Sequence, residues 1–320
     1  MSSREPQLHP TYAECERTGP RLPFDTMSLT EIRALSTKMF KETIAKLSLP
    51  PMHKEELFID SHGRSIELII TRPPGTENTE LPVLLFLHGG GFVLCDKFSH
   101  HTIVNDIVEK SNVAVVFVEY SLAPEHPFPA GLEDCYTAFH WIIEHGKEHH
   151  LDPSRIAVGG DSAGGNFTAA LSLKLKDAGE EKLMKSQILI YPATMLAKEH
   201  FESYDLFGHL TVSLDSLQFF NRNYLPGPVQ EVDDKYALPG LATDDDLKGL
   251  PPALVITAES DILRDEGEAY AHRLNAAGVE TSMVRILGAP HGYISMSFNT
   301  PQYRHSLALI TAFLHETLKQ

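Results

Sequence analysis

Short apolar runs recur along the chain and predict the strands of a sheet. The eight runs are EELFID (55–60), SIELIITR (65–72), PVLLFLH (82–88), VAVVFVEY (113–120), RIAVGG (155–160), QILIY (187–191), ALVITA (253–258) and TSMVRIL (281–287). The first two alternate between apolar and polar positions and are joined by SHGR, which predicts an antiparallel hairpin. The later runs are continuously apolar and separated by helix-length segments, as is typical of buried parallel strands. The pattern therefore predicts an α/β fold with an eight-stranded, mostly parallel sheet flanked by helices.

Two segments fall outside this alternation. Residues 1–50 contain one predicted helix, which begins after Ser28 and has Glu31 three residues later as a capping box. Residues 192–250 form the longest gap between predicted strands and contain several aromatic residues. An insertion of this length and composition favours a lid over a disordered linker, although a second small core would use the same residues.

Composition and charge narrow the functional classes. The 320 residues include 27 basic and 43 acidic side chains, a net charge of −16 that would repel nucleic acid and anionic membranes. No apolar segment reaches the ~20 residues that span a bilayer, and the N-terminus lacks the apolar core of a signal peptide. The three cysteines, an odd number without metal-ligand spacing, favour reduced thiols. We therefore expect a cytoplasmic protein with no nucleic-acid or membrane partner, and leave a homodimer open.

The stretch GGDSAGG, residues 159–165, places Ser162 in the pattern G-x-S-x-G. This pattern alone is common, but here it directly follows a predicted strand and precedes a predicted helix. A strand-to-helix turn of this kind is the context of a nucleophile elbow. Because a serine hydroxyl is a weak nucleophile, the hypothesis also requires a histidine base, an acid and donors for an oxyanion.

Candidates for these partners follow other predicted strands. HGGGF contains Gly89, Gly90 and Gly91, whose backbone N–H groups can approach a reacting carbonyl because no β-carbon is present. Asp261 follows ALVITA and is the favoured acid, whereas its rivals Asp265 and Glu266 fall where a helix should begin.

His291, in GAPHGY, follows the last predicted strand and is the candidate base. The chain has 17 histidines, but those in stretches such as EHGKEHH are interpreted as a solvated face, and no H-E-x-x-H zinc motif occurs. The order Ser, Asp, His along the chain is that of α/β-hydrolases.

The motifs HGGGF, YSLAPEHPFPA, GDSAGGN, ESDILRDEGEAYA and HGY together resemble the hormone-sensitive-lipase-like group of α/β-hydrolase esterases. The resemblance extends from about residue 55 to the C-terminus. Ser121 and Ile262 depart from the residues that many members have at these positions, in loops that support the site. The resemblance implies an α/β-hydrolase fold with a helical cap, in which the catalytic domain spans 51–320 and the cap comprises residues 1–50 and an insertion at about 192–250.

The same resemblance implies the roles of the site residues. Ser162 would be the nucleophile, His291 the base and Asp261 its orienting acid. The oxyanion hole would comprise the N–H groups of Gly90, Gly91 and Ala163, with Gly89 shaping the same loop.

A serine carboxylester hydrolase acting on small to medium-chain soluble esters is therefore expected, with no cofactor and no metal. An amidase, formamidase or lactonase would use the same residues. A non-catalytic small-molecule receptor of this fold would lose the histidine, which this chain retains.

Overall fold

All eight apolar runs form strands of one sheet in the computed structural model, which describes residues 7–19 and 26–319. The strands are β1 (His53–Ser61), β2 (Arg64–Arg72), β3 (Leu81–Leu87), β4 (Ala114–Glu119), β5 (Leu151–Asp161), β6 (Met184–Ile190), β7 (Ala253–Ser260) and β8 (Thr281–Pro290). Their order is β1-β2-β4-β3-β5-β6-β7-β8. Strand β2 is antiparallel to both β1 and β4, and the other pairs are parallel. The predicted hairpin and the mostly parallel sheet are confirmed.

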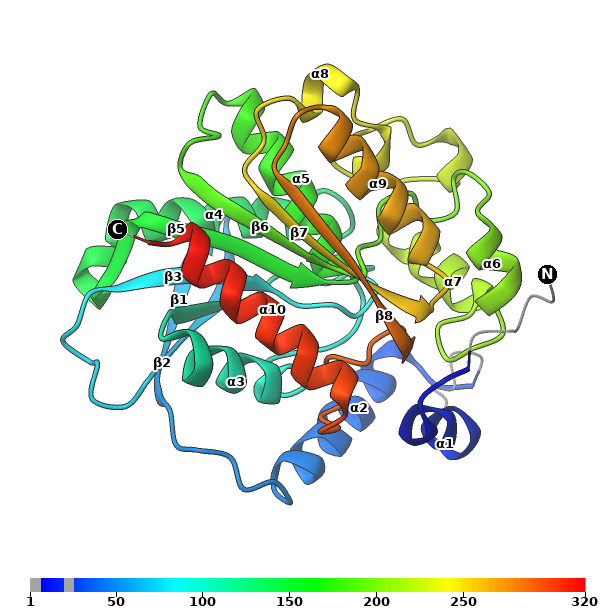
Figure 1. Cartoon of the computed structure of the whole chain (residues 1–320), viewed down its shortest axis with the longest axis horizontal. Helices are drawn as coiled ribbons and strands as arrows, with labels where there is room; N and C mark the ends of the chain where they lie inside the picture. Colours follow the sequence, from blue (N-terminus) through cyan, green and yellow to red (C-terminus); the bar gives the residue numbers. More distant parts are fainter. Residues whose placement is uncertain (1–6, 20–25, 320) are drawn as a thin grey trace.

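Helices cover both faces of the sheet (Figure 1). One face carries α3 (His101–Ser111) and α10 (Pro301–Thr317), and the other carries α4 (Ala130–His145), α5 (Ala163–Asp177) and α9 (Arg264–Ala276). The central strands supply alternate residues to the two cores. Leu85 and Leu87 of β3 pack on the α5 side, whereas Leu84 and Phe86 pack on the α3 side. Burial on both faces explains why these runs are continuously apolar.

The described part of the N-terminal region contains two helices, whereas the sequence predicted one. Helix α2 (Leu29–Ile44) begins after Ser28 with the expected capping box to Glu31. The additional helix, α1 (Pro10–Thr18), buries only Tyr12, whose hydroxyl lies 2.6 Å from Thr300 Oγ1. Part of the predicted cap segment, residues 1–6 and 20–25, lies outside the described residues.

The insertion after β6 is packed against the rest of the molecule. It contains α6 (Glu202–Phe207), α7 (Leu214–Tyr224) and the short α8 (Asp244–Leu247), with 3₁₀ turns at Val229–Glu231 and Pro239–Leu241. A further 3₁₀ turn, Gly146–His149, follows α4. Several aromatic side chains of the insertion are buried, namely Tyr204, Phe207 and Tyr224. Their burial explains why an insertion of this length is ordered.

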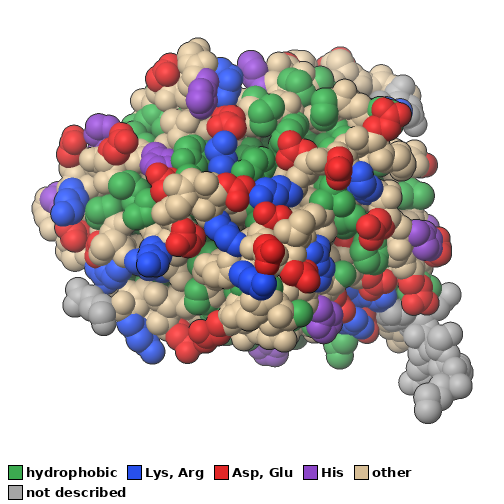
Figure 2. All heavy atoms as spheres, turned by 90° about the horizontal axis from the view of Figure 1, so that it is seen from above, with side chains coloured by type: hydrophobic (Ala, Val, Ile, Leu, Met, Phe, Trp, Pro, Cys, Tyr) green, Lys and Arg blue, Asp and Glu red, His purple; other side chains and the backbone are tan. Residues whose placement is uncertain are grey.

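Charge is distributed evenly on one face of the molecule. Figure 2 shows Lys and Arg side chains interspersed with Asp and Glu, so this face has no large basic patch despite the net charge of −16. Within residues 7–19 and 26–319, no helix combines the length and apolar character needed to cross a bilayer.

Candidate active site

Ser162 lies on a sharp turn between β5 and α5. Its φ of 55° and ψ of −116° are a conformation that L residues rarely adopt. A Cβ atom at Gly160 would lie 2.3 Å from the carbonyl oxygen of Leu87, and one at Gly164 only 1.8 Å from it. Glycine at both positions therefore allows the turn to pack against the end of β3, which brings Ser162 beside the loop that follows this strand.

His291 and Asp261 lie next to this serine, directly after β8 and β7. The structure places His291 Nε2 2.9 Å from Ser162 Oγ, and His291 Nδ1 2.8 Å from Asp261 Oδ2. The other oxygen of Asp261, Oδ1, accepts the N–H of Leu263 at 2.8 Å. Three side chains from three loops thus form one line of contacts, because parallel strands present their carboxyl ends at the same edge of a sheet.

The rival carboxylates lie elsewhere. Asp265 Oδ2 accepts the N–H of Ser203 at the start of α6, at 2.8 Å. Glu266 is buried, and its Oε1 accepts the N–H of Thr194 at 2.6 Å. Both acids therefore hold the insertion against α9, and of the three candidates Asp261 is the one in contact with His291.

The environment of His291 favours its protonated form. Burial alone would lower its pKa, because desolvation disfavours an imidazolium. The charge of Asp261 and its hydrogen bond outweigh this effect, and Asp161 and Glu266 act in the same direction, so the pKa of His291 is raised above its usual value. This arrangement stabilises the imidazolium that forms when a histidine takes a proton from serine.

The glycine loop contributes backbone donors to the site. Gly90 and Gly91 have φ values of 121° and 61°, which glycine adopts readily. The N–H of Gly89 donates to Asp161 Oδ1 at 2.8 Å and is therefore already engaged. The N–H groups of Gly90, Gly91 and Ala163 have no acceptor among the described residues, and all three residues line the cavity that contains the serine.

This cavity has a volume of about 160 Å³ and a largely apolar wall. Helix α7 and the neighbouring part of the insertion provide much of the wall. The apolar side chains of the wall include Phe92, Ala193, Leu196, Val212, Leu217, Phe220 and Leu263. Tyr224 of α7 stacks on Phe92 with ring centroids 3.6 Å apart, which joins the insertion to the glycine loop.

Helix α2 contributes no lining residue to this cavity within the described chain. Instead, Arg33 of α2 donates to the carbonyl oxygens of Val93 and Ala123 at 2.8 and 2.7 Å. The helix therefore supports the segment that follows the glycine loop.

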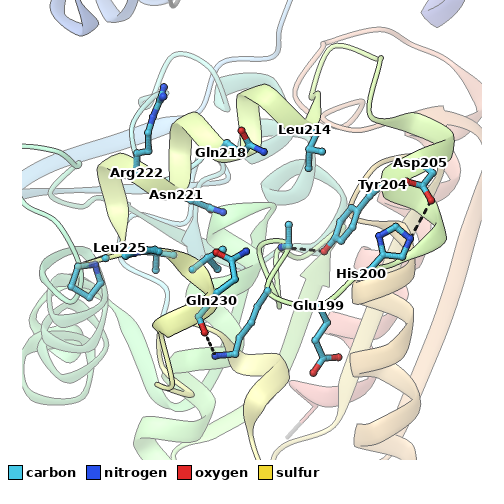
Figure 3. A pocket seen from close by; sticks show the side chains of 16 residues that line it. Glu199, His200, Tyr204, Asp205, Leu214, Gln218, Asn221, Arg222, Leu225 and Gln230 are labelled. Carbon is cyan, nitrogen blue, oxygen red and sulfur yellow. Dashed lines mark hydrogen bonds and ion pairs between the residues drawn. The ribbon is translucent and has the colours of Figure 1, made fainter.

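A second, larger hollow of about 820 Å³ lies within the insertion (Figure 3). Helix α7 separates the two spaces, because Leu217 and Phe220 line the serine cavity while Gln218 and Asn221 line the hollow. The hollow contains both acidic and basic side chains, and His200 pairs there with Asp205 at 3.1 Å. It contains none of the three residues proposed for catalysis.

No group of three or more His, Cys, Asp or Glu side chains that could hold a metal occurs in the described part of the chain.

Sequence reasoning missed three buried residues beside the serine, two of which, His100 and Asp161, line the same cavity. Asp161 contacts both His100 and Tyr191, although the three residues come from separate segments. Asp161 offered one signal, because an acid at the end of an apolar strand needs polar partners when it is buried. The identity of those partners depends on contacts across the fold.

Comparison with known proteins places the chain in the same family that the sequence motifs resemble. A family model described as the α/β hydrolase fold matches residues 84–295. Carboxylesterase NlhH of Mycobacterium tuberculosis is 34% identical over 284 residues, which cover 87% of this chain and 88% of the relative. Ethyl acetate hydrolase of Pseudomonas putida is 28% identical, with 94% of each chain covered.

Solved structures agree over nearly the whole chain. One belongs to a study of two fungal esterases from Rhizomucor miehei; it has 44% identity, a TM-score of 0.93 and coverage of 98% of this chain and 99% of the other. A thermostable esterase from Pseudomonas putida has 36% identity and a TM-score of 0.90, with 99% and 100% covered. The resemblance to hormone-sensitive-lipase-like esterases is thereby confirmed, and the chain belongs to the α/β hydrolase fold family.

Proposed function

We propose that the chain is a serine carboxylesterase in which Ser162 is the nucleophile, His291 the general base and Asp261 the acid that orients it. The continuous contact from Ser162 Oγ through both ring nitrogens of His291 to Asp261, at 2.9 and 2.8 Å, supports this proposal most strongly. Such an arrangement activates a serine hydroxyl and fixes the imidazole tautomer that accepts its proton.

The geometry supports a two-step reaction. Ser162 Oγ attacks the ester carbonyl while His291 Nε2 takes its proton, and the N–H groups of Gly90, Gly91 and Ala163 stabilise the oxyanion. His291 then protonates the leaving alcohol, and an acyl-enzyme remains. Water, deprotonated by His291, releases the acid and restores the serine.

The cavity supports a preference for small to medium-chain esters. Its apolar wall stabilises an acyl chain by up to ~0.8 kcal/mol for each buried methylene. The volume of about 160 Å³ sets an end to this gain. We expect kcat/KM to rise and then fall as the acyl chain lengthens from acetate to about decanoate, because the gain stops where the pocket ends.

We further propose that residues 192–250 and 1–50 form a cap on a catalytic domain that spans residues 51–320. The insertion supports this division by supplying α7 to the cavity wall. Helix α2 supports it indirectly, because Arg33 holds the segment after the glycine loop. Removal of residues 1–46 should therefore loosen that segment and flatten the chain-length profile.

Partners and location are proposed on separate grounds. A homodimer would use β8, the last strand of the sheet, where Leu287 is 66% exposed, and light scattering would detect it. A cytoplasmic location is supported by the three unpaired thiols of Cys15, Cys95 and Cys135. Fractionation of the cells that produce the protein would test the location.

Ser162→Ala tests the catalytic assignment. The variant should fold normally and lose about 10⁴-fold or more in esterase activity, because only oxyanion and binding contributions remain. An organophosphonate probe should label Ser162 in the native protein and no serine in the variant. Native turnover by Ser162→Ala would refute the assignment.

A substrate panel separates esterase from the alternatives. Hydrolysis of p-nitrophenyl esters should exceed that of matched anilides, formamides and lactones. A preference for one of those classes would replace esterase by amidase, formamidase or lactonase. Absence of both turnover and labelling would favour a receptor, a reading that the placement of His291 opposes.

A further inference from the structure

Asp161 connects the two segments that supply the proposed oxyanion donors. It immediately precedes Ser162, and the residue is buried, with only 3% of its surface exposed. Its Oδ1 accepts the N–H of Gly89 at 2.8 Å, across 72 positions of the chain. Gly89 begins the glycine loop, while the donor Ala163 follows the serine. One side chain therefore links both halves of the site.

The fit between Asp161 and the loop is close. A Cβ atom at Gly89 would lie 2.5 Å from Asp161 Oδ2, so a larger residue would displace either the carboxylate or the loop. The loop itself has left-handed backbone angles at Gly90 and Gly91, and also at Phe92 and Cys95, where φ is 65° and 73°. Non-glycine residues adopt such angles only when surrounding contacts impose them.

Two other side chains hold the carboxylate in place. The hydroxyl of Tyr191 donates to Asp161 Oδ2 at 3.3 Å. His100 Nε2 lies 2.8 Å from Asp161 Oδ1, and both side chains are buried. Burial would raise the pKa of Asp161, but His100 and the Gly89 N–H outweigh burial and lower it. The side chain is therefore a carboxylate, which accepts hydrogen bonds with both oxygens.

We propose that Asp161 is a positioning residue of the oxyanion hole. Through Gly89 it fixes the N–H groups of Gly90 and Gly91 relative to that of Ala163, so that all three face the same developing charge. The inference rests on the proposed esterase function. Because oxyanion donors act mainly in the transition state, loss of this alignment should reduce kcat more than it changes KM.

The test compares Asp161→Asn with Asp134→Asn. Asp134 is a matched control, because it is also a buried carboxylate, paired with Arg64 at 2.6 Å, but it lies on α4 away from the cavity. For each variant, kcat and KM are measured with p-nitrophenyl butyrate. The inhibition constant of an alkyl trifluoromethyl ketone is measured as well, since this ketone adds the serine oxygen to form an alkoxide in the oxyanion hole.

Asp161→Asn should lower kcat by about 10–100-fold, less than the 10²–10³ expected when a donor is removed outright. The inhibition constant of the ketone should rise by a similar factor, with KM within about twofold of native. Asp134→Asn should lower thermal stability without this coupled loss. Tyr191→Phe keeps the ring and removes one hydrogen bond to Asp161. It should lower kcat and raise the inhibition constant of the ketone as Asp161→Asn does, but by smaller factors.

Several outcomes overturn the inference: unchanged kcat in Asp161→Asn, reduced kcat with unchanged ketone affinity, or an equal coupled loss in Asp134→Asn. If Asp161→Asn does not fold, Tyr191→Phe decides, and native values of both constants there refute the proposal. Assays of the native protein distinguish failure of the esterase proposal from failure of the Asp161 proposal. If the native protein neither hydrolyses the ester nor is labelled at Ser162, the esterase proposal fails, and the inference about Asp161 fails as well. If the native protein is active, unchanged kinetics in the Asp161 variant refute only the role of Asp161.

Discussion

Replacement of Asp261 by Asn tests the orientation of the base, with Asp265→Asn as its matched control. Both oxygens of Asp261 act as acceptors, Oδ1 for the N–H of Leu263 and Oδ2 for His291 Nδ1, each at 2.8 Å. An amide has one acceptor oxygen, so one of these bonds must be lost. If the oxygen stays on Leu263, the NH₂ group faces His291 and favours the tautomer protonated on Nε2.

That tautomer cannot accept the proton of the serine. The expected loss in kcat is about 10⁴-fold, or about 5.5 kcal/mol in the transition state. Asp265→Asn keeps an acceptor for Ser203 and leaves His291 untouched, so it should cost only about 1 kcal/mol of stability. Both variants are assayed with p-nitrophenyl butyrate and by thermal unfolding. Comparable kinetic damage in Asp265→Asn, with Asp261→Asn active, would show that the acid is misassigned.

Three further predictions concern pH and packing. Only neutral imidazole accepts a proton, and Asp261 raises the pKa of His291. The pH at which kcat/KM falls on the acidic side should therefore lie above about 6.5, the ordinary pKa of imidazole. A fall in kcat/KM centred below pH 6.5 would contradict the raised pKa. Burial raises the pKa of Glu266 from 4.5 to about 7, so the folded state binds the carboxyl proton of Glu266 more tightly than the unfolded state does. The stability that this protonated side chain contributes is fully present below pH 4.5 and is lost as the pH rises to about 7. Thermal unfolding of Glu266→Gln should show a weaker pH dependence across this window, and a native-like dependence argues against it. Gly164→Ala should destabilise the fold by about 1–3 kcal/mol in denaturant unfolding, because its Cβ would collide with Leu87, and an unchanged midpoint would refute the close approach.

The strands and the line of catalytic candidates were predictable because both depend on local pattern. A parallel strand buried on two faces must be apolar throughout, as in PVLLFL, which forms β3. Residues just beyond such strands share one edge of the sheet, so Ser162, Asp261 and His291 could be grouped without knowledge of the strand order.

The remaining features depend on contacts that sequence pattern does not encode. Helix α1 buries only Tyr12 and has no apolar stripe, so nothing distinguished it from a polar loop. His100 is one of 17 histidines, and its role becomes visible only when the fold places it 2.8 Å from Asp161. The engagement of the Gly89 N–H likewise required the distance between two segments that are remote in the chain.

Helix α7 has a consequence for how this enzyme can diversify. One side of a single helix, with Leu217 and Phe220, bounds the acyl space, and the neighbouring side, with Gln218 and Asn221, borders a hollow about five times larger by the volumes of about 160 and 820 Å³. Substitutions in α7 can therefore enlarge or reshape the space for substrate while every atom that takes part in bond making stays in place. Selection can explore new substrates along this helix without first losing the reaction.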